Sequence, residues 1–311
     1  MPPVSTYSIP DLPPQVSFET VPIYKALGEA KAGLAELKGL ATAIPNQGIL
    51  IETLALQEAK ASSEIENIVT TQDEIFKGEL DIDGYLSGPV KEVIRYRDAM
   101  KLGFDALRQP QGLIRNNTLI EQYRLLKGRD DGFRDSAGTD LRGTGGSTVY
   151  VPPQIPDNVT KHMTALELFI NEDEASTLDP LIKMAIIHHQ FESIHPFSDG
   201  NGRVGRMLNV LYLCREGLLD SPILYLSRAI NATKADYYRL LQAPRDAAAE
   251  GNAEAEWQDW VVYILEAVAD TAKATILLVR QIRSQMAEMK TAIRDGDLAK
   301  IYSQDLLNNL F

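Results

Sequence analysis

The stretch HPFSDGNGRVGR, residues 195–206, places one histidine, one aspartate, three glycines and two arginines within twelve residues. Its glycines follow the spacing G-x-G-x-x-G, which also occurs in dinucleotide-binding loops. Such a loop needs a strand before it, whereas the residues before His195 recur with helical spacing. A P-loop is excluded as well, because no G-K-[ST] follows the glycines. We therefore expect a loop that joins two helices.

The turn Gly200-Asn201-Gly202 begins the second of these helices. Its backbone N–H groups then point the same way at the positive end of the helix dipole, which is a binding site for anions. Glycine also lets a phosphate approach the backbone closely. Arg203 and Arg206 are three positions apart and share one helix face. Two guanidinium groups beside an anion site suit a polyphosphate.

Two further residues supply what chemistry at a phosphoryl centre needs. Asp199 would repel a bare phosphate, but it suits a Mg²⁺ ion shared between one carboxylate and phosphate oxygens. His195, four residues earlier, is placed to take a proton from an incoming hydroxyl. The whole set predicts phosphoryl-group chemistry. The simpler alternative is a capped helix turn with two surface arginines and a packed histidine.

The composition is that of a soluble, acidic chain. The 311 residues carry a net charge of −12, so the chain has no general attraction for nucleic acids. Its single cysteine, Cys214, cannot form an internal disulfide and indicates a reducing compartment. The start, MPPVSTYSIPDLPP, lacks the regions of a signal peptide, and no run approaches the ~20 apolar residues of a membrane span. We expect a cytoplasmic protein that binds neither membranes nor nucleic acids.

The rest of the chain shows helical periodicity with one interruption. We expect helices at about 22–43, 49–65, 89–107, 113–127, 157–171, 180–193, 234–249 and 254–297. A capping box at Thr71 and the pair Asp179-Pro180 mark helix starts. The interruption, Gly128–Asp157, is dense in glycine, aspartate and proline, and the strand Thr148–Val151 lies within it. The sequence predicts an all-α fold with one short β-hairpin.

The opening stretch resembles the signature of Fic-domain proteins, H-x-F-x-[D/E]-G-N-G-R-x-x-R. The fixed positions that match are His195, Phe197, Asp199, Gly200, Asn201, Gly202, Arg203 and Arg206. The resemblance implies a Fic-type helical bundle over about residues 20–290. It divides the chain into N-terminal arm and helices at 1–90, a catalytic core at 91–230 and C-terminal helices at 231–311. The apolar ending LLNNLF raises the alternative that a further domain follows.

The resemblance implies a protein adenylyltransferase, in which a Ser, Thr or Tyr hydroxyl of a target protein attacks the α-phosphate of ATP. His195 would be the base and Asp199 the ligand of Mg²⁺. The residues implied to bind ATP are Gly200, Asn201, Gly202, Arg203, Gly205, Arg206 and Tyr238. The predicted hairpin resembles the family's flap, which pairs with the backbone of the target through Thr148, Val149, Tyr150 and Val151.

A second motif, Ser62-x-x-x-Glu66-Asn67, resembles the inhibitory motif [S/T]-x-x-x-E-[G/N] of the same family. The simpler alternative is a helix end at which Glu66 is solvated and Asn67 is a cap. Beside the full signature, the motif implies that Glu66 pairs with Arg206, removes the clamp on the γ-phosphate and repels the triphosphate. The inhibitory group would then belong to the chain itself.

Several alternatives stay open at this point. An enzyme of the same fold could chiefly remove AMP from a modified target, with Glu66 orienting a water, or it could transfer another nucleotide. A non-enzymatic module that senses nucleotides is a rival of a different class. The target is unknown and could be the chain itself, and a homodimer that shifts the inhibitory helix is a further expectation. The adjacent His188 and His189 are expected to pack, because they point to different helix faces.

Overall fold

The computed structural model describes residues 7–42, 44, 47–80, 87–143, 145–172, 176–248 and 251–295. Within these residues the fold is a bundle of α-helices with one small sheet, as the sequence predicted. The helices are α1 (Val21–Ala41), α2 (Gln47–Ile65), α3 (Gln72–Glu79), α4 (Gly88–Leu107), α5 (Asn116–Lys127), α6 (Pro156–Asn171), α7 (Pro180–Ile194), α8 (Asn201–Arg215), α9 (Ser227–Ala232), α10 (Lys234–Ala248) and α11 (Glu254–Asp295). The sequence did not predict α9, because six residues are too few to show periodicity.

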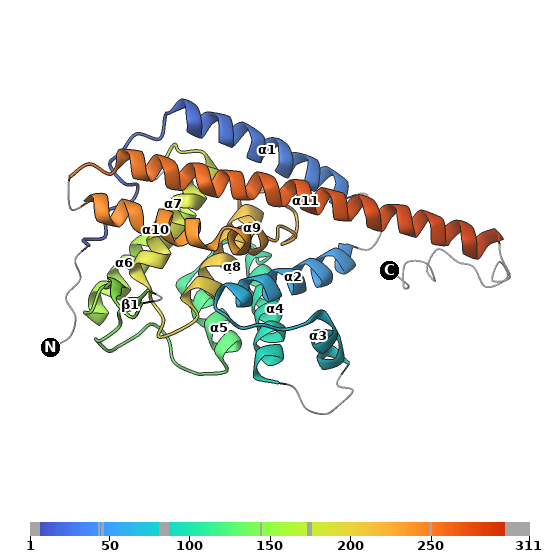
Figure 1. Ribbon diagram of the computed structural model, residues 1–311, viewed down its shortest axis with the longest axis horizontal. Helices are drawn as coiled ribbons and strands as arrows, with labels where there is room; N and C mark the ends of the chain where they lie inside the picture. The colour runs from blue at the N-terminus through green and yellow to red at the C-terminus, as the bar shows by residue number, and fades with distance from the viewer. Residues whose placement is uncertain are drawn as a thin grey trace.

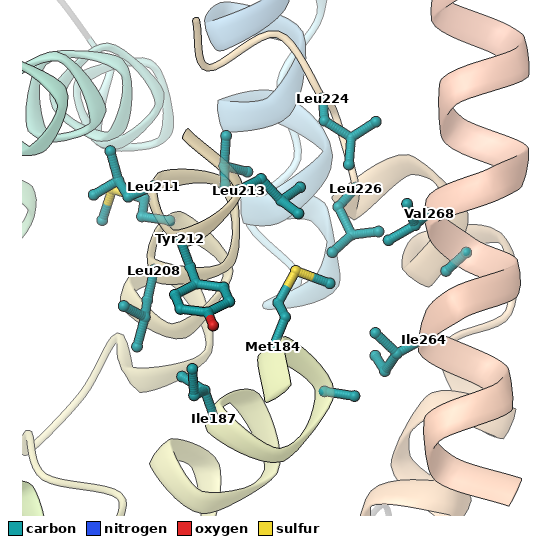
Figure 2. Close-up of a cluster of buried hydrophobic side chains, with 14 of the residues drawn as sticks. Met184, Ile187, Leu208, Leu211, Tyr212, Leu213, Leu224, Leu226, Ile264 and Val268 are labelled. Carbon is teal, nitrogen blue, oxygen red and sulfur yellow. The ribbon is translucent and has the colours of Figure 1, made fainter. Parts of the chain in front are cut away.

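Helices α7 and α8 lie at the centre of the bundle. α7 is buried from Leu181 to Ile194 and α8 from Arg203 to Leu213, and burial on every face marks a core helix. Figure 2 labels side chains from both helices and from the segments around them: Met184, Ile187, Leu208, Leu211, Tyr212, Leu213, Leu224, Leu226, Ile264 and Val268. The loop that joins α7 to α8 is therefore anchored in the core at both ends.

Helices α1 and α11 run side by side along one edge of the bundle (Figure 1). They approach closely at Gly33, where a Cβ atom would lie 3.1 Å from the Cβ atom of Ala272. On its other side α11 contacts the core, because Trp260 Nε1 donates a hydrogen bond to the carbonyl oxygen of Ala185 in α7 at 2.9 Å. The pairing thus joins segments from opposite ends of the described chain and covers α7.

The predicted hairpin is present and is short. Strands β1 (Leu141–Arg142) and β2 (Thr148–Tyr150) pair in antiparallel fashion. The predicted strand is one residue too long, since Val151 lies beyond β2 and is buried with 6% of its surface exposed. Val149 is 49% exposed, whereas Tyr150 is 2% exposed. One side of the hairpin thus faces solvent while Tyr150 anchors the other side in the protein.

The sequence predicted no membrane-spanning segment, and it singled out an apolar ending at residues 306–311. No helix among the described residues is long and apolar enough to cross a membrane. The apolar ending LLNNLF, residues 306–311, lies outside the described residues. The described part of α11 ends at Asp295.

Candidate active site

The loop between α7 and α8 begins with an unusual backbone. His195 ends α7 in the left-handed conformation, with φ 51° and ψ 60°, and its N–H donates to the carbonyl oxygen of Phe191 at 2.9 Å. Gly200 begins α8 with a φ of 77°, which glycine adopts readily. A histidine adopts a positive φ far less readily, so the surrounding contacts must hold it there.

Two side chains hold the loop from within. Phe197 is fully buried and its ring stacks on the ring of Tyr123, with 4.2 Å between centroids. The side-chain amide of Asn201 bonds the backbone of Phe197 twice, since Oδ1 accepts from its N–H and Nδ2 donates to its carbonyl, each at 2.8 Å. The sequence suggested that Asn201 holds phosphates. Its side chain is occupied by the loop, so the part left for an anion is its backbone N–H.

The imidazole of His195 is held in its neutral form. Burial lowers its pKa most, the positive charges of Arg134 and Arg245 lower it further, and Asp199 opposes them. A neutral imidazole can accept a proton at neutral pH, which is the state that a general base needs. The motif alone could not reveal this, because both arginines lie outside it in the sequence.

Asp199 and Arg203 belong to a closed network of four charges. Lys127 Nζ lies 2.7 Å from an Asp199 carboxylate oxygen and 3.6 Å from a Glu92 carboxylate oxygen. Arg203 pairs with Glu92 and lies 3.8 Å from Asp199. The Arg203 side chain is only 2% exposed, so the structure places it as a partner of Glu92 and not as an open guanidinium. Sequence reasoning missed Glu92 and Lys127, since nothing in their spacing links them to the motif.

Asp199 is the residue that fits a Mg²⁺ ion. Its side chain is 56% exposed and stands at the start of α8. Burial opposes its ionisation, but Lys127, Arg203 and the N–H of Gly200 outweigh burial and hold its pKa below the ordinary value. The described residues contain no cluster of three His, Cys, Asp or Glu side chains that could hold a metal alone. One carboxylate suits an ion that takes its remaining ligands from phosphates and water.

The motif Ser62–Asn67 meets the signature of residues 195–206 at Arg206. The Arg206 side chain is 1% exposed, and its Nη2 lies 3.0 Å from a Glu66 carboxylate oxygen. Its Nε donates to Ser62 Oγ at 2.8 Å, and Nη2 also donates to the Ser62 carbonyl oxygen at 3.0 Å. A side chain at Gly202 would collide with the Glu66 carboxylate. Glu66 therefore lies directly against the glycine turn at the start of α8.

A buried carboxylate fixes α2, the helix whose last turn begins this motif. Glu58 is 2% exposed and accepts hydrogen bonds from the Ser227 N–H at 2.9 Å, from the Ser227 hydroxyl and from the Tyr96 hydroxyl at 3.1 Å. Burial raises the pKa of Glu58, and its donors oppose that shift. Glu58 thus ties α2 to both α4 and α9. The end of the motif is tied more loosely, since Lys234 Nζ donates to the exposed Asn67 at 3.1 Å.

Tyr238 and His188 lie near Arg206, whereas His189 lies against Trp257. Tyr238 is 44% exposed. Burial of its hydroxyl raises its pKa to about 12, and the Glu66 carboxylate raises it too. The two histidines are buried: His188 Nε2 lies 2.9 Å from the Tyr237 hydroxyl, and the ring of His189 lies 4.4 Å from the ring of Trp257. The histidines pack, whereas Tyr238 stands at the edge of the site.

The helical bundle, in which a histidine loop leads into a glycine-rich helix start beside a short hairpin, agrees with the fold that the motif implied. The profile described as Fic/DOC family N-terminal matches residues 24–105, and the Fic/DOC family profile matches residues 109–213. Together they span more than half of the chain and confirm the resemblance inferred from the motif, so the chain belongs to the Fic/DOC family.

Relatives and a solved structure agree with this assignment. The chain is 30% identical over 154 residues to the protein adenylyltransferase fic-1 of Caenorhabditis elegans, which is 48% of this chain and 28% of that protein. It is 30% identical over 187 residues to a probable protein adenylyltransferase of Aquifex aeolicus, covering 59% of this chain and 55% of that one. A crystal structure of a Fic family protein from Desulfovibrio desulfuricans superposes with a TM-score of 0.65 at 26% identity, over 94% of this chain and 84% of that chain. The chain thus spans less than two thirds of these two curated relatives.

Proposed function

We propose that the chain is a protein adenylyltransferase whose own Glu66 inhibits it. The catalytic half of the proposal is supported by the neutral His195 beside the start of α8 and by relatives that are named protein adenylyltransferases. The inhibitory half is carried by one observation, the Glu66 carboxylate that pairs with Arg206 at 3.0 Å and lies against Gly202.

In the proposed reaction the oxygen of a target hydroxyl attacks the α-phosphorus of ATP. The hydroxyl proton passes to the imidazole of His195, the bond from the α-phosphorus to the bridging oxygen breaks, and pyrophosphate leaves with the bonding electrons. The backbone N–H groups at the Gly200–Gly202 turn bind phosphate oxygens at the positive end of α8. Asp199 would hold a Mg²⁺ ion, which neutralises phosphate charge when bound.

Inhibition follows from competition for a single arginine. Arg206 is buried and already bonded to Ser62, so its guanidinium has little freedom to turn toward another anion. While Glu66 holds it, a γ-phosphate meets a carboxylate where it needs a cation, and the triphosphate is displaced from the pose that reaction requires. Movement of Glu66 away from Gly202 would release both the arginine and the glycine turn.

The test is transfer of label from α-³²P-ATP in the presence of Mg²⁺, using the purified chain as its own acceptor. The variants are Glu66→Gly, His195→Ala in the Glu66→Gly background, and Glu64→Gly. Glu64 is the matched control, because it lies two residues before Glu66, in the last turn of α2, but pairs with Lys60 and Asn231 and not with Arg206. A hydrogen bond to a charged group contributes about 1.5–3 kcal/mol, so Glu66→Gly should raise labelling by about 10- to 100-fold.

The outcomes distinguish an inhibited adenylyltransferase from a loosened helix and from a nucleotide-sensing protein. Labelling that rises with Glu66→Gly, stays at the wild-type level with Glu64→Gly and vanishes with His195→Ala supports both halves of the proposal. Equal gains with Glu64→Gly and Glu66→Gly would assign the effect to a loosened helix and contradict inhibition by the ion pair. Nucleotide binding without labelling in any variant, and without release of AMP from a protein labelled in advance, would favour a nucleotide-sensing role. Comparison with labelled UTP, GTP and CTP tests the choice of nucleotide.

A further inference from the structure

Arg134 is a buried arginine that the sequence motifs did not single out. It lies between α5 and β1 and is 7% exposed. Its Nε donates to the carbonyl oxygen of His195 at 2.7 Å, and its Nη2 donates to the carbonyl oxygens of Ile194, at 3.3 Å, and Pro153. Its own backbone N–H donates to the carbonyl oxygen of Pro196 at 2.8 Å. This one residue therefore bonds three consecutive residues where α7 ends and the His195 loop begins.

The partners of Arg134 differ in kind from those of the two arginines in the motif. Arg203 pairs with Glu92 and Arg206 with Glu66, whereas the described part of the chain gives Arg134 no carboxylate partner. A buried guanidinium without a counter-charge costs free energy, and burial lowers the pKa of Arg134 accordingly. Its rigid fork of five N–H donors suits several carbonyl oxygens at once. The Arg134 side chain therefore binds backbone carbonyl oxygens and not a carboxylate.

The carbonyl groups that Arg134 bonds lie on two separate segments. Ile194 and His195 lie where α7 ends and the loop begins, and Pro153 follows β2 of the hairpin. A second tie joins the same two segments, because the Tyr150 hydroxyl donates to the carbonyl oxygen of Ser193 at 2.7 Å.

The tie at Tyr150 is itself supported by an arginine from α10. The Arg245 guanidinium lies over the Tyr150 ring, 4.0 Å from its centroid, and Arg245 Nε donates to Ser193 Oγ at 3.0 Å. Arg245 is 5% exposed. The hairpin is thus joined at Tyr150 to the last turn of α7, and Arg134 is the residue whose side chain bonds both Pro153 and His195 directly.

We propose that Arg134 is a positioning residue that holds the His195 loop and the hairpin in one frame, so that the base and the hydroxyl of a hairpin-bound target stay aligned. The proposal rests on the proposed AMP transfer. Arg134 bonds the carbonyl of the residue with the left-handed backbone, so it stabilises the conformation that presents the imidazole. It forms no hydrogen bond to a residue expected to bind ATP.

This role predicts a particular kinetic pattern. Loss of the frame misplaces the base relative to the acceptor, and misplacement by about 1 Å can cost 100-fold in rate. Nucleotide binding at the start of α8 should be little affected, because Arg134 does not contact it. The positive charge of Arg134 also lowers the pKa of His195, so its removal should move the acid limb of the rate profile to higher pH.

The experiment compares Arg134→Gln and Arg134→Lys with Arg124→Gln, all in the full chain carrying Glu66→Gly. Arg124 is the matched control, since its Nε donates to a loop carbonyl, that of Asp131, at 3.1 Å, but it does not reach the His195 loop. We expect Arg134→Gln to lower kcat for labelling by about 100-fold while the KM for ATP changes by less than about twofold. Arg134→Lys should recover part of kcat, because lysine keeps the charge but carries all its N–H donors on one nitrogen and cannot reach every carbonyl oxygen that arginine bonds. Arg124→Gln should match its parent.

A second measurement is independent of catalysis. Hydrogen–deuterium exchange should quicken in Arg134→Gln in two segments together, 150–154 and 193–197, while the remainder of α7 stays protected. Unchanged kcat, or exchange that rises across the whole protein, would overturn the proposal. If the Glu66→Gly parent fails to transfer AMP, the proposed function fails, and joint exchange of the two segments still decides whether Arg134 forms the frame.

Discussion

The two motifs each contain a residue other than glycine with a left-handed backbone, and the two are held in opposite ways. Among the described residues these are His195, with φ 51°, and Asn67, with φ 61°. The His195 segment is bonded through its main chain by buried groups, including Arg134 and Asn201. Asn67 is exposed, and the side-chain contact that reaches it comes from Lys234 near solvent.

This difference separates a fixed part of the site from a part that can be released. Main-chain bonds among buried groups break only with local unfolding, whereas a contact between exposed side chains costs little to break. Glu66 lies between these extremes, since its partner Arg206 is buried while its own side chain is 32% exposed. We therefore expect His195, the proposed base, to keep its position when Glu66 moves away from Arg206.

The largest effect on labelling is expected from removing the two hydrogen bonds by which the Asn201 side chain holds the loop. Asn201→Leu removes both bonds to the backbone of Phe197 and leaves a buried N–H and carbonyl unpaired, at about 1–3 kcal/mol for each group. We expect labelling in the Glu66→Gly background to fall by about 100-fold and the melting temperature to fall with it. Thermal unfolding beside the transfer assay measures both. Full activity in this variant would show that the loop conformation does not depend on the hydrogen bonds of the Asn201 side chain.

The free energy of unfolding should depend on pH through Glu192, a buried carboxyl group of α7. Burial raises the pKa of Glu192 from 4.5 to about 7; Arg206 and Arg245 oppose this and Glu66 adds to it. Because the folded state binds this proton more tightly, its stabilising effect is complete below about pH 4.5 and is lost as pH rises through 7. Glu192→Gln should therefore gain stability relative to wild type between these values, by about 3 kcal/mol at most. Urea unfolding at pH 4.5, 6 and 8 tests this, and a constant difference would contradict it.

Glu58, which fixes α2, tests whether a looser α2 alone raises labelling. Glu58→Gln places an amide where the Ser227 N–H and hydroxyl need an acceptor, so it should weaken the hold of α9 on α2. We expect about tenfold more labelling than wild type together with lower stability. Glu66→Gly should raise labelling without a comparable loss of stability. Titration of both variants with urea, beside the transfer assay, separates a loosened helix from a missing carboxylate.

The smallest effect should come from the exposed contact at the end of the motif. Lys234→Ala removes the bond to Asn67, and an exposed polar contact contributes about 0.2–1 kcal/mol, so labelling should rise about twofold. Lys273→Ala is the control, because its contact with Glu29 at 3.4 Å is also exposed but lies on the α1–α11 edge. A tenfold rise with Lys234→Ala would mean that the exposed contact, and not the Arg206 pair, holds the segment in place.

The sequence predicted what is written in contiguous patterns. The pair Asp179-Pro180 begins α7, the Thr71 capping box begins α3, and the glycine turn begins α8. The fold class followed from helical periodicity and from the resemblance of residues 195–206 to the Fic signature, and the proximity of Glu66 to Arg206 followed from the second motif. Sequence could not reveal Arg134, Glu92 or Lys127, because a lone charged residue usually lies in solvent and their partners are distant along the chain. Because the sequence did not reveal Glu92, Arg203 was expected to bind only a phosphate, whereas the structure pairs it with Glu92.

The position of Glu66 against Gly202 has a consequence for how the site responds to salt. The anion position at the start of α8 is already neutralised from within the chain, so an incoming anion exchanges with a carboxylate instead of filling an open positive site. Such an exchange changes the local charge little and releases few counter-ions. Nucleotide binding to the wild-type chain should therefore depend only weakly on ionic strength, and removal of the Glu66 carboxylate should make it steep.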